Sequence, residues 1–348
     1  MRWLSDLSPE LQRVLVRCDL NVPLESGKVL DDFRIRASLP TIQALRERGH
    51  KVILLTHLGD PHGKTVESLR VYPVASALRD LGVPVTGVRA TVGKEVENAI
   101  EKLEPGGVLL LENVRFCPGE EDNDSVFAKK LSRLGDAYVN DAMGVSHRAH
   151  ASLVLVPSLL PSFGGLLLEQ EVRVLSKIKE NPSQPFVVIV GGAKVESKGS
   201  VIEALAKKAN TVLLGNLIGD KLRLERPELL KLPNVISAVD GIMEGERALD
   251  IGPRAREDFL KALQGAGTVF WAGPLGMVED ERFREGSRVV ANFLASLDNV
   301  FSVAGGGDLA AFLGKEGLRE KLGYVSTGGG ATLHYVAGEE LPGLKALS

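Results

Sequence analysis

The sequence predicts an α/β protein made of two Rossmann-like lobes, each a parallel sheet flanked by helices, joined by a hinge helix. Length is the first observation behind this prediction: 348 residues exceed the size at which a single hydrophobic core keeps growing, so two domains are expected. The pattern of apolar residues along the chain is the second observation. Short runs rich in leucine and β-branched residues alternate with amphipathic helical stretches, which is typical of βαβ units.

Each half of the chain supplies several short apolar runs that end in Gly, Asn, Asp or His. In the first half we expect strands at residues 14–17, 51–56, 107–111 and 137–139. In the second half we expect them at residues 186–190, 211–214, 268–271, 300–303 and 324–325. Because parallel strands share one carboxyl edge, residues that follow these strands are expected to converge in space.

The boundary between the lobes is expected near the middle of the chain. Residues 156–165 are rich in Pro, Ser and Gly, and a helical stretch from about 166 to 179 follows, ended by Asn181-Pro182. We therefore expect a first domain at residues 1–155, a linker with the hinge helix at 156–180, a second domain at 181–336, and a tail at 337–348 that packs back on a lobe.

Composition restricts the class of protein. Hydrophobic residues make up 44% and charged residues 25%, as in folded soluble proteins, and a net charge of −3 argues against a nucleic-acid coat. Cys18 and Cys117 lie in no CxxC or Cys/His ladder, so neither a metal nor a disulfide is expected. The apolar runs are too short for a membrane span and no secretion signal opens the chain, so we expect a cytoplasmic monomer without nucleic-acid or membrane partners.

Cationic and polar side chains follow the strands of the first half. They are Arg17, Asp19, Asn21, His57, Arg115 and Arg148, and Arg34 could join them from a loop. A single arginine is more often a surface group. Four arginines with a histidine at strand exits instead indicate a site for a small, multiply anionic metabolite, because guanidinium forks match phosphate and carboxylate oxygens.

Glycine-rich turns follow the strands of the second half. The segments begin at Gly191-Gly192-Ala193-Lys194, Gly273-Pro274, Gly305-Gly306-Gly307-Asp308 and Gly328-Gly329-Gly330. Such turns let backbone N–H groups and helix N-termini approach nucleotide phosphates. None matches the P-loop or the GxGxxG fingerprint, so another nucleotide fold is required.

Three charged side chains stand in these turns. Lys194 and Lys198 share a helix face if the helix starts there, and their ammonium groups could then reach phosphates. Asp308 suits a Mg²⁺ anchor, an N-cap, or both.

Taken together, the segments resemble phosphoglycerate kinase from the first strand to the last few residues. The motifs occur in the family's order: Arg-x-Asp-x-Asn-Val-Pro, His-Leu-Gly, Glu-Asn-Val-Arg-Phe, His-Arg-Ala-His-Ala-Ser, Gly-Gly-Ala-Lys-Val, Asp-Ile-Gly-Pro, Gly-Gly-Gly-Asp and Ser-Thr-Gly-Gly-Gly-Ala. The resemblance implies reversible phosphoryl transfer from 1,3-bisphosphoglycerate to ADP, giving 3-phosphoglycerate and ATP in glycolysis or gluconeogenesis.

The resemblance also implies residue roles. In the first lobe, the acid substrate is held by Asp19, Asn21, Arg34, His57, Arg115 and Arg148, with Arg17 adding to the basic patch. In the second lobe, Lys194 steadies the transferring phosphoryl, Lys198 binds nucleotide phosphates, Asp308 holds Mg²⁺ and Glu279 binds the ribose. The nucleotide set is completed by Gly192, Ala193, Gly273, Pro274, Gly305, Gly306, Gly307, Gly328 and Gly329. The implied catalytic set is Arg34, Lys194, Gly305 and Gly328.

Several positions depart from the family pattern. Asp60 stands where the family usually has arginine, Ala272 replaces an asparagine, Leu309 replaces Ser or Thr, and the segment after Leu214 is shorter than usual. We therefore expect an active kinase with a trimmed nucleotide lobe and altered nucleotide affinity. The alternatives are a non-catalytic phosphoglycerate kinase-like binding protein with a weakened nucleotide site, and a dehydrogenase, which the missing GxGxxG makes remote.

Overall fold

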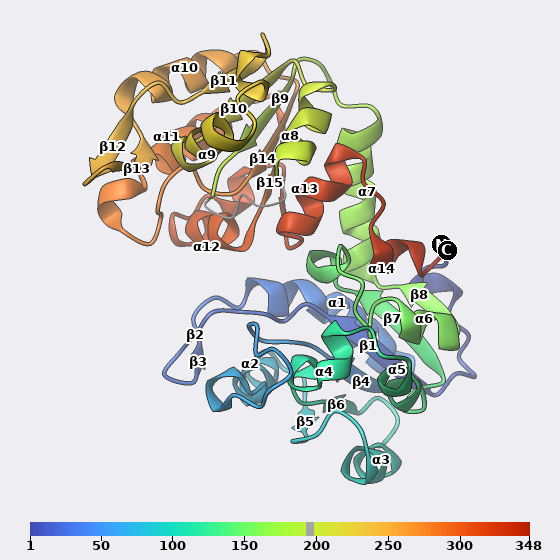
Figure 1. The fold of residues 1–348 in the computed structure, drawn as a ribbon. Coiled ribbons are helices and arrows are strands. Elements are labelled where there is room, and N and C mark those ends of the chain that lie inside the picture. Colours follow the sequence, from blue (N-terminus) through green and yellow to red (C-terminus); the bar gives the residue numbers. More distant parts are fainter. Residues whose placement is uncertain (193–197) are drawn as a thin grey trace. The chain divides into compact units, whose positions relative to one another are not determined.

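The computed structural model describes residues 1–192 and 198–348 (Figure 1). The chain divides into two compact units. The first consists of Met1–Val172 with Glu340–Ser348, and the second of Arg173–Glu339. Helix α7 (Leu166–Glu180) begins in the first unit and continues into the second.

A six-stranded sheet in the order β5-β6-β4-β1-β7-β8 forms the centre of the first unit, and all of its neighbouring strands are parallel. Its strands are β1 (Arg13–Cys18), β4 (Lys51–Leu55), β5 (Val85–Gly87), β6 (Val108–Leu110), β7 (Ala137–Asp141) and β8 (Ser162–Gly164). Central β1 is paired on both sides, with Val14 opposite Val52 of β4 and Ala137 of β7. Apart from the edge strand β5, the strands are largely buried because helices cover both faces.

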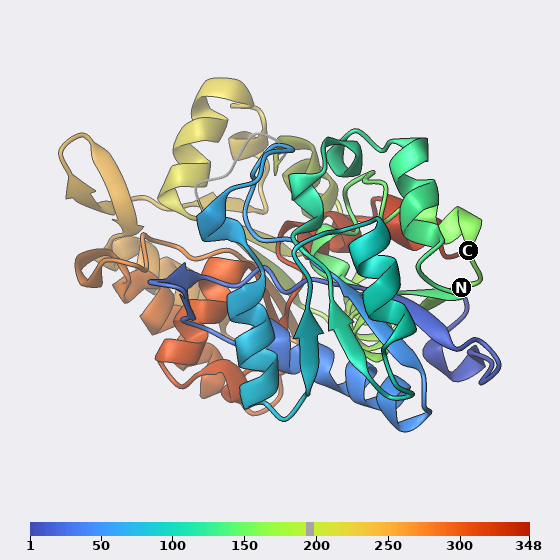
Figure 2. The same ribbon diagram turned by 90° about the horizontal axis from the view of Figure 1, so that it is seen from below.

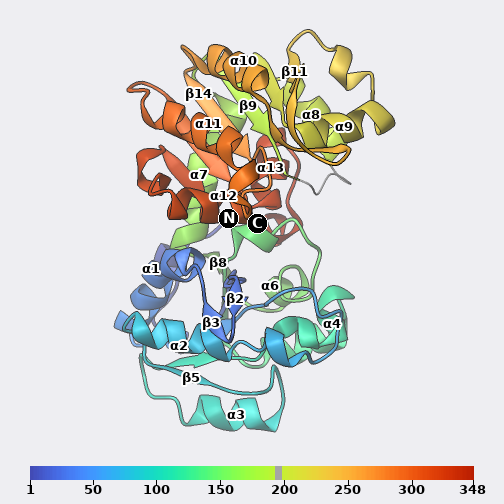
Figure 3. The ribbon, with the colours of Figure 1, turned by 90° about the vertical axis from the view of Figure 1, so that its left-hand side faces the viewer.

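Helices pack on the two faces of this sheet. They are α1 (Phe33–Glu47), α2 (Tyr72–Asp80), α3 (Lys94–Glu101), α4 (Pro118–Glu121), α5 (Ser125–Ser132) and α6 (Leu155–Leu159). Contacts join α1 to α2, and α5 to both α4 and α6. Figure 3 shows α1 on one side of this unit and α4 and α6 on the other. A small antiparallel pair, β2 (Leu24–Glu25) with β3 (Lys28–Val29), connects β1 to α1.

The sheet of the first unit contains two strands that the sequence did not lead us to expect, β5 and β8. Residues 156–165, expected to be linker, contain β8, which pairs with β7 and extends the sheet. The C-terminal helix α14 (Pro342–Lys345) also belongs to this unit, and the Gly343 N–H donates to the Ser146 carbonyl at 2.8 Å. The last residues therefore complete the first unit although they follow the second in sequence.

The second unit contains another parallel sheet, in the order β11-β10-β9-β14-β15-β16. Its strands are β9 (Phe186–Val190), β10 (Thr211–Leu214), β11 (Val235–Ser237), β14 (Thr268–Ala272), β15 (Phe301–Gly305) and β16 (Tyr324–Ser326). Along the chain, β10 and β11 are added on one side of β9, and β14, β15 and β16 are then added on its other side. The carboxyl ends of β9 and β14 therefore flank a topological switch point, where parallel sheets bind ligands.

Helices flank this sheet as well. They are α8 (Lys198–Ala206), α9 (Asn216–Glu225), α10 (Pro253–Leu263), α11 (Glu285–Ala295), α12 (Gly307–Lys315) and α13 (Gly330–Ala337). Contacts join α8 to α13 and α10 to α11, on opposite sides of the sheet in Figure 1. The hairpin β12 (Gly241–Glu244) and β13 (Arg247–Ile251) extends away from the unit in Figure 2. Two parallel sheets flanked by helices confirm the predicted fold class.

Within the described residues, no helix has both the length and the apolar character needed to cross a membrane.

Candidate active site

Four arginines gather around His57 at the carboxyl edge of the first sheet. His57 follows β4 and is buried, and its Nδ1 lies 3.5 Å from Nη2 of Arg17. Burial lowers the pKa of His57 well below 6.5, and the charges of Arg17, Arg115, Arg34 and Arg148 lower it further. These arginines are far apart in sequence; the strand exits bring Arg17, Arg115 and Arg148 toward His57, and Arg34 joins them from α1.

Arg34 is fixed by the loop that follows β1. It lies in the first turn of α1, whereas a loop was expected, and its side chain is 17% exposed. Its Nη1 donates to Oδ1 of Asp19 and to the Asn21 carbonyl, both at 3.1 Å. Oδ1 of Asn21 accepts from the Gly59 N–H at 3.0 Å. Arg34, Asp19 and Asn21 therefore form one hydrogen-bonded group that also holds the loop after β4.

Arg115 is positioned by a short 3₁₀ helix, η3 (Val114–Phe116), after β6. Asn113 caps this helix: its Oδ1 accepts from the Arg115 N–H at 3.1 Å, and its Nδ2 donates to the Leu58 carbonyl at 2.8 Å. The Arg115 guanidinium donates to the Gly59 carbonyl at 2.8 Å and pairs with Asp60. Asn113, which our sequence analysis did not select, is therefore a support for Arg115.

Arg148 and Arg17 occupy opposite environments within this cluster. Arg148 is exposed, whereas Arg17 is completely buried. Nε of Arg17 donates to Oγ of Ser152 at 3.0 Å, and this hydroxyl donates to the buried carboxylate of Glu120 at 2.6 Å. No part of Arg17 is accessible for direct contact, so its charge and its contact with His57 are its only links to the surface of this cluster.

Ser152 and Glu120 were also missed by sequence reasoning. Ser152 ends the His-Arg-Ala-His-Ala-Ser motif, from which only Arg148 was selected as a site residue. A serine and a glutamate 32 residues apart show no pattern that predicts their contact. Only the packing of the helix α4 against the segment after β7 brings the two together.

In the second unit, two glycine turns meet at the switch point. The Gly191 N–H donates to the Ala272 carbonyl at 2.9 Å, and the Gly192 N–H donates to the Pro274 carbonyl at 2.7 Å. A Cβ atom on Gly191 would lie 2.1 Å from the Pro274 carbonyl oxygen, so this approach requires glycine. Gly273 has a φ of +81° and donates to the Gly305 carbonyl at 3.0 Å. Three strand ends are thereby linked in one turn structure.

Two further glycine turns open helices at the same edge. Gly306, with φ +123°, precedes α12, and Gly329, with φ +55°, precedes α13. Asp308 is exposed in the first turn of α12. Helix N-termini preceded by glycine present free N–H groups to anions, so this edge suits phosphate binding.

Four members of the predicted nucleotide set are described only in part or not at all. Ala193 and Lys194 lie outside the described residues, and Lys198 is placed only as the first residue of α8. Glu279 is exposed in the segment after β14.

Buried side chains support the turn after β14. Nε1 of Trp271 donates to the Gly273 carbonyl at 2.8 Å, and Oγ of Ser287 accepts from the Leu275 N–H at 2.9 Å. Asp250, fully buried, accepts from the Gly286 N–H at 2.7 Å. Burial raises the pKa of Asp250 to about 6. The Asp-Ile-Gly-Pro motif marked this residue in the sequence, but not its support of α11.

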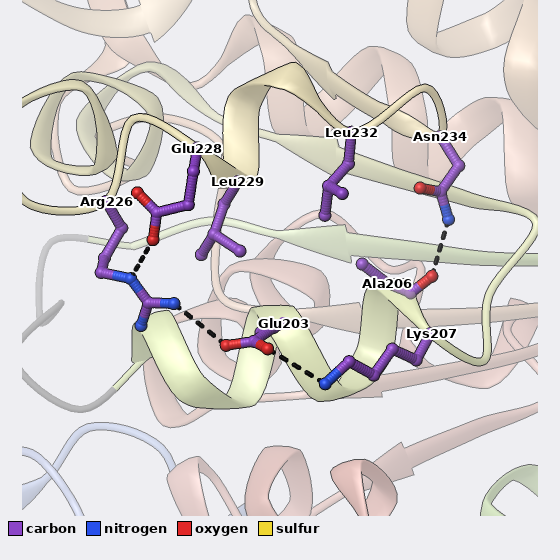
Figure 4. Close-up of a pocket in the computed structure, with 8 residues that line it drawn as sticks. All are labelled: Glu203, Ala206, Lys207, Arg226, Glu228, Leu229, Leu232 and Asn234. Carbon is purple, nitrogen blue, oxygen red and sulfur yellow. Dashed lines mark hydrogen bonds and ion pairs between the residues drawn. The ribbon is translucent and has the colours of Figure 1, made fainter.

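A surface cavity of about 300 Å³ lies elsewhere in the second unit, between α8 and residues 226–234 (Figure 4). Its charged groups are paired with one another: Arg226 with Glu203 and Glu228, and Lys207 with Glu203. Asn234, which closes it, stands before β11, at the amino edge of the sheet. The cavity is therefore separate from the glycine turns.

An arginine-rich edge on one parallel sheet and helix-opening glycine turns on another define a class of α/β proteins built to hold anionic ligands. Comparison with protein families identifies the family within this class. Residues 4–222 and 225–339 match the model described as phosphoglycerate kinase, so the chain belongs to the phosphoglycerate kinase family.

Curated relatives named phosphoglycerate kinase match along the whole chain. The protein from Moorella thermoacetica is 44% identical, covering 99% of this chain and 98% of the relative. That from Thermus thermophilus is 41% identical and covers all of both chains. Both alignments, 387 and 389 residues long, exceed the 348 residues of this chain, so the relatives contain segments that it lacks.

Solved structures agree with these sequence matches. The phosphoglycerate kinase from Pyrococcus horikoshii has a TM-score of 0.89 at 31% identity, covering 100% of this chain and 98% of the other. The one from Coxiella burnetii has a TM-score of 0.78 at 33% identity, covering 99% and 98%.

Proposed function

We propose that this protein is an active phosphoglycerate kinase, which transfers a phosphoryl group reversibly between 1,3-bisphosphoglycerate and ADP to give 3-phosphoglycerate and ATP. The observation that carries the proposal is the convergence of Arg17, Arg34, Arg115 and Arg148 on His57 at the edge of the first sheet. A site with this excess of guanidinium groups suits a ligand that carries both carboxylate and phosphate. Family membership over the whole chain supports the same reaction.

The first unit is proposed to hold the acid. Arg34 and Arg115 supply guanidinium forks, and Arg148 adds an exposed cation. Asp19 and Asn21 orient Arg34 and can accept from the hydroxyl group of the substrate. Arg17 adds charge from beneath, and His57, whose pKa is lowered, serves as a neutral hydrogen-bonding group.

The second unit is proposed to hold the nucleotide. Its phosphates are proposed to lie against the glycine turns at Gly192, Gly273–Pro274, Gly305–Gly307 and Gly328–Gly329, where the first turns of α12 and α13 supply backbone N–H donors. Ala193 and Lys198 are proposed to bind phosphates as well, and Glu279 to bind the ribose. The exposed carboxylate of Asp308 fits a Mg²⁺ ion that is otherwise bound by nucleotide phosphates and water. When bound, the ion neutralises phosphate charge.

Transfer needs no covalent intermediate. An oxygen of the terminal ADP phosphate attacks the acyl phosphate in line, and the chain positions both and offsets their charge, with Lys194 on the transferring group. Direct transfer requires the two phosphates to meet. We therefore propose that α7, which runs from one unit to the other, bends when both substrates are bound.

A coupled assay with 1,3-bisphosphoglycerate tests this function. Turnover with ADP is expected, and parallel reactions with GDP and UDP measure base preference in the shortened lobe. Lys194→Ala should abolish turnover while both substrates still bind, whereas Lys207→Ala, on an exposed lysine paired with Glu203, should keep it. Absence of turnover in the unmodified chain would contradict the proposal.

Calorimetric titration separates this proposal from the non-catalytic alternative, for which the comparisons provide no support. An active enzyme binds both 3-phosphoglycerate and Mg-ADP, whereas the alternative binds the acid alone. We also propose that the protein acts as a cytoplasmic monomer. Sedimentation of the purified chain checks its oligomeric state.

A further inference from the structure

The carboxylate of Asp60 forms an ion pair with the guanidinium of Arg115. The Arg115 side chain is only 3% exposed, and its Nη1 pairs with Oδ1 of Asp60. The same nitrogen donates to the Gly59 carbonyl at 2.8 Å, and Nε lies 3.5 Å from Oε1 of Glu121. Arg115 is thus a buried guanidinium whose outward partner is a carboxylate oxygen of its own chain.

Charge explains why a carboxylate takes this position. Burial lowers the pKa of Arg115, and the charges of Arg17 and Arg148 lower it further, while Asp60 and Glu121 act in the opposite direction. The cluster therefore has an excess of positive charge that an anion stabilises. A carboxylate oxygen of Asp60 and an oxygen of an anionic ligand satisfy the same donor in the same way.

The side chain of Asp60 is placed so that it can rotate away from Arg115. Its side chain is 56% exposed, so rotation farther into solvent takes no charge out of water. The backbone beside it is held in place, because the Gly59 N–H donates to Oδ1 of Asn21 at 3.0 Å. The side chain can therefore move away from Arg115 while the loop stays in the site.

We propose that Asp60 is an internal competitor of the acid substrate: its carboxylate occupies Arg115 in the ligand-free protein and must be displaced when the anion binds. This inference rests on the proposed function for the identity of the anion, but not for the competition itself. Asp60 thereby lowers the affinity for every anion at Arg115, and ligands with more charge displace it more readily. It is a residue that sets substrate affinity and selectivity.

Two substitutions in the full-length chain test the competition. Asp60→Asn removes the charge and keeps the shape, and Asp60→Ala removes the acceptor as well. Titration calorimetry with 3-phosphoglycerate should give a Kd lowered by up to about fivefold in both variants, the range expected for a partly exposed ion pair. The KM for the acid should fall by a similar factor while the KM for ATP stays constant.

Glu67→Gln is the matched control. Glu67 pairs with Arg70 in the same unit, is 78% exposed, and its loss changes the net charge as Asp60→Asn does. Its Kd for the acid should match that of the unmodified chain. An equal gain in affinity in Glu67→Gln would attribute the effect to net charge and overturn the proposal. Weaker binding in the Asp60 variants would also overturn it, because Asp60 would then orient Arg115 for the ligand.

Inorganic phosphate is a second probe, and it separates failure of this proposal from failure of the proposed function. If the unmodified chain neither binds 3-phosphoglycerate nor turns over, the function is wrong. Competition at Arg115 still predicts tighter phosphate binding in both Asp60 variants. Equal phosphate affinity in the unmodified chain and the variants would overturn the competition.

Discussion

Arg34 and Asp19 form an ion pair at the carboxyl edge of the first sheet, with Nη1 of the arginine 3.0 Å from Oδ2 of the aspartate. Asp19 is buried and Arg34 is partly so, and a second bond joins Arg34 to the Asn21 carbonyl. The pair connects α1 to the loop after β1. The guanidinium is therefore oriented before any ligand arrives, which lowers the ordering cost of binding.

Replacing Arg34 by lysine tests this orientation. Arg34→Lys keeps the charge but loses the planar fork, so kcat/KM for the acid should fall about tenfold to hundredfold, as expected when a charge-assisted hydrogen bond is lost. Arg36→Lys is the control, since Arg36 forms an exposed pair with Asp32 on the same helix. Steady-state kinetics with varied acid measure both, and equal loss in the two variants would contradict the role of Arg34.

Ser152 links Arg17 to Glu120, so Ser152→Ala should destabilise the protein. The buried Glu120 carboxylate would lose the hydroxyl donor at 2.6 Å, and Nε of Arg17 would lose its acceptor at 3.0 Å. The free energy of unfolding should fall by about 2 kcal/mol in urea denaturation, since buried charged groups would be left unsatisfied. Ser158→Ala, at an exposed serine that donates to the Leu155 carbonyl, should change it by less than about 0.5 kcal/mol.

Gly306→Ala should destabilise the protein. Gly306 has φ +123° and ψ 132°, a conformation that side chains disfavour, so alanine should cost roughly 1–3 kcal/mol. Gly330→Ala is the matched control, because Gly330 begins α13 and a Cβ there would meet no atom within 4 Å. Thermal unfolding compares the two variants. Equal stability would show that the turn before α12 tolerates a side chain.

Asp250 makes stability depend on pH. Its pKa rises from 3.8 to about 6 on folding, because burial disfavours the charged carboxylate; the charge of Glu285 acts in the same direction, while the N–H groups of Gly286 and Ile251 and the charge of Arg256 act against it. The folded state therefore binds more protons than the unfolded state between these values, and this contribution to stability is lost as the pH rises through about 6.

Urea denaturation at pH 4.5 and 7.5 measures this effect. The free energy of unfolding of the unmodified chain, relative to that of Asp250→Asn, should fall by roughly 1–3 kcal/mol between the two pH values. The comparison with asparagine removes the contributions of other carboxylates, including Asp136, whose pKa is lowered by Arg13. A difference that does not change with pH would contradict a raised pKa at Asp250.

Some elements were predictable and others were not, for identifiable reasons. The strands at Phe186–Val190 and Thr211–Leu214 agree with prediction because each is a continuous apolar run. Strand β8 was missed because three residues after Pro161 show no such run, and its stability comes from pairing with β7. The helix containing Arg34 was not recognised at its start, since Pro40 lies inside it.

By itself, the sequence determined the local periodicity, the two-lobed α/β class, and the rim of polar residues at strand ends, because these follow from backbone geometry and the burial of apolar runs. Tertiary structure alone decided which side chains hold that rim in place. The tertiary contacts join residues that are far apart in the sequence and belong to no repeating pattern. Examples are Arg115 with Asp60, Ser152 with Glu120, and Asp250 with Gly286. Their existence depends on how the loops pack, which single-sequence patterns do not encode.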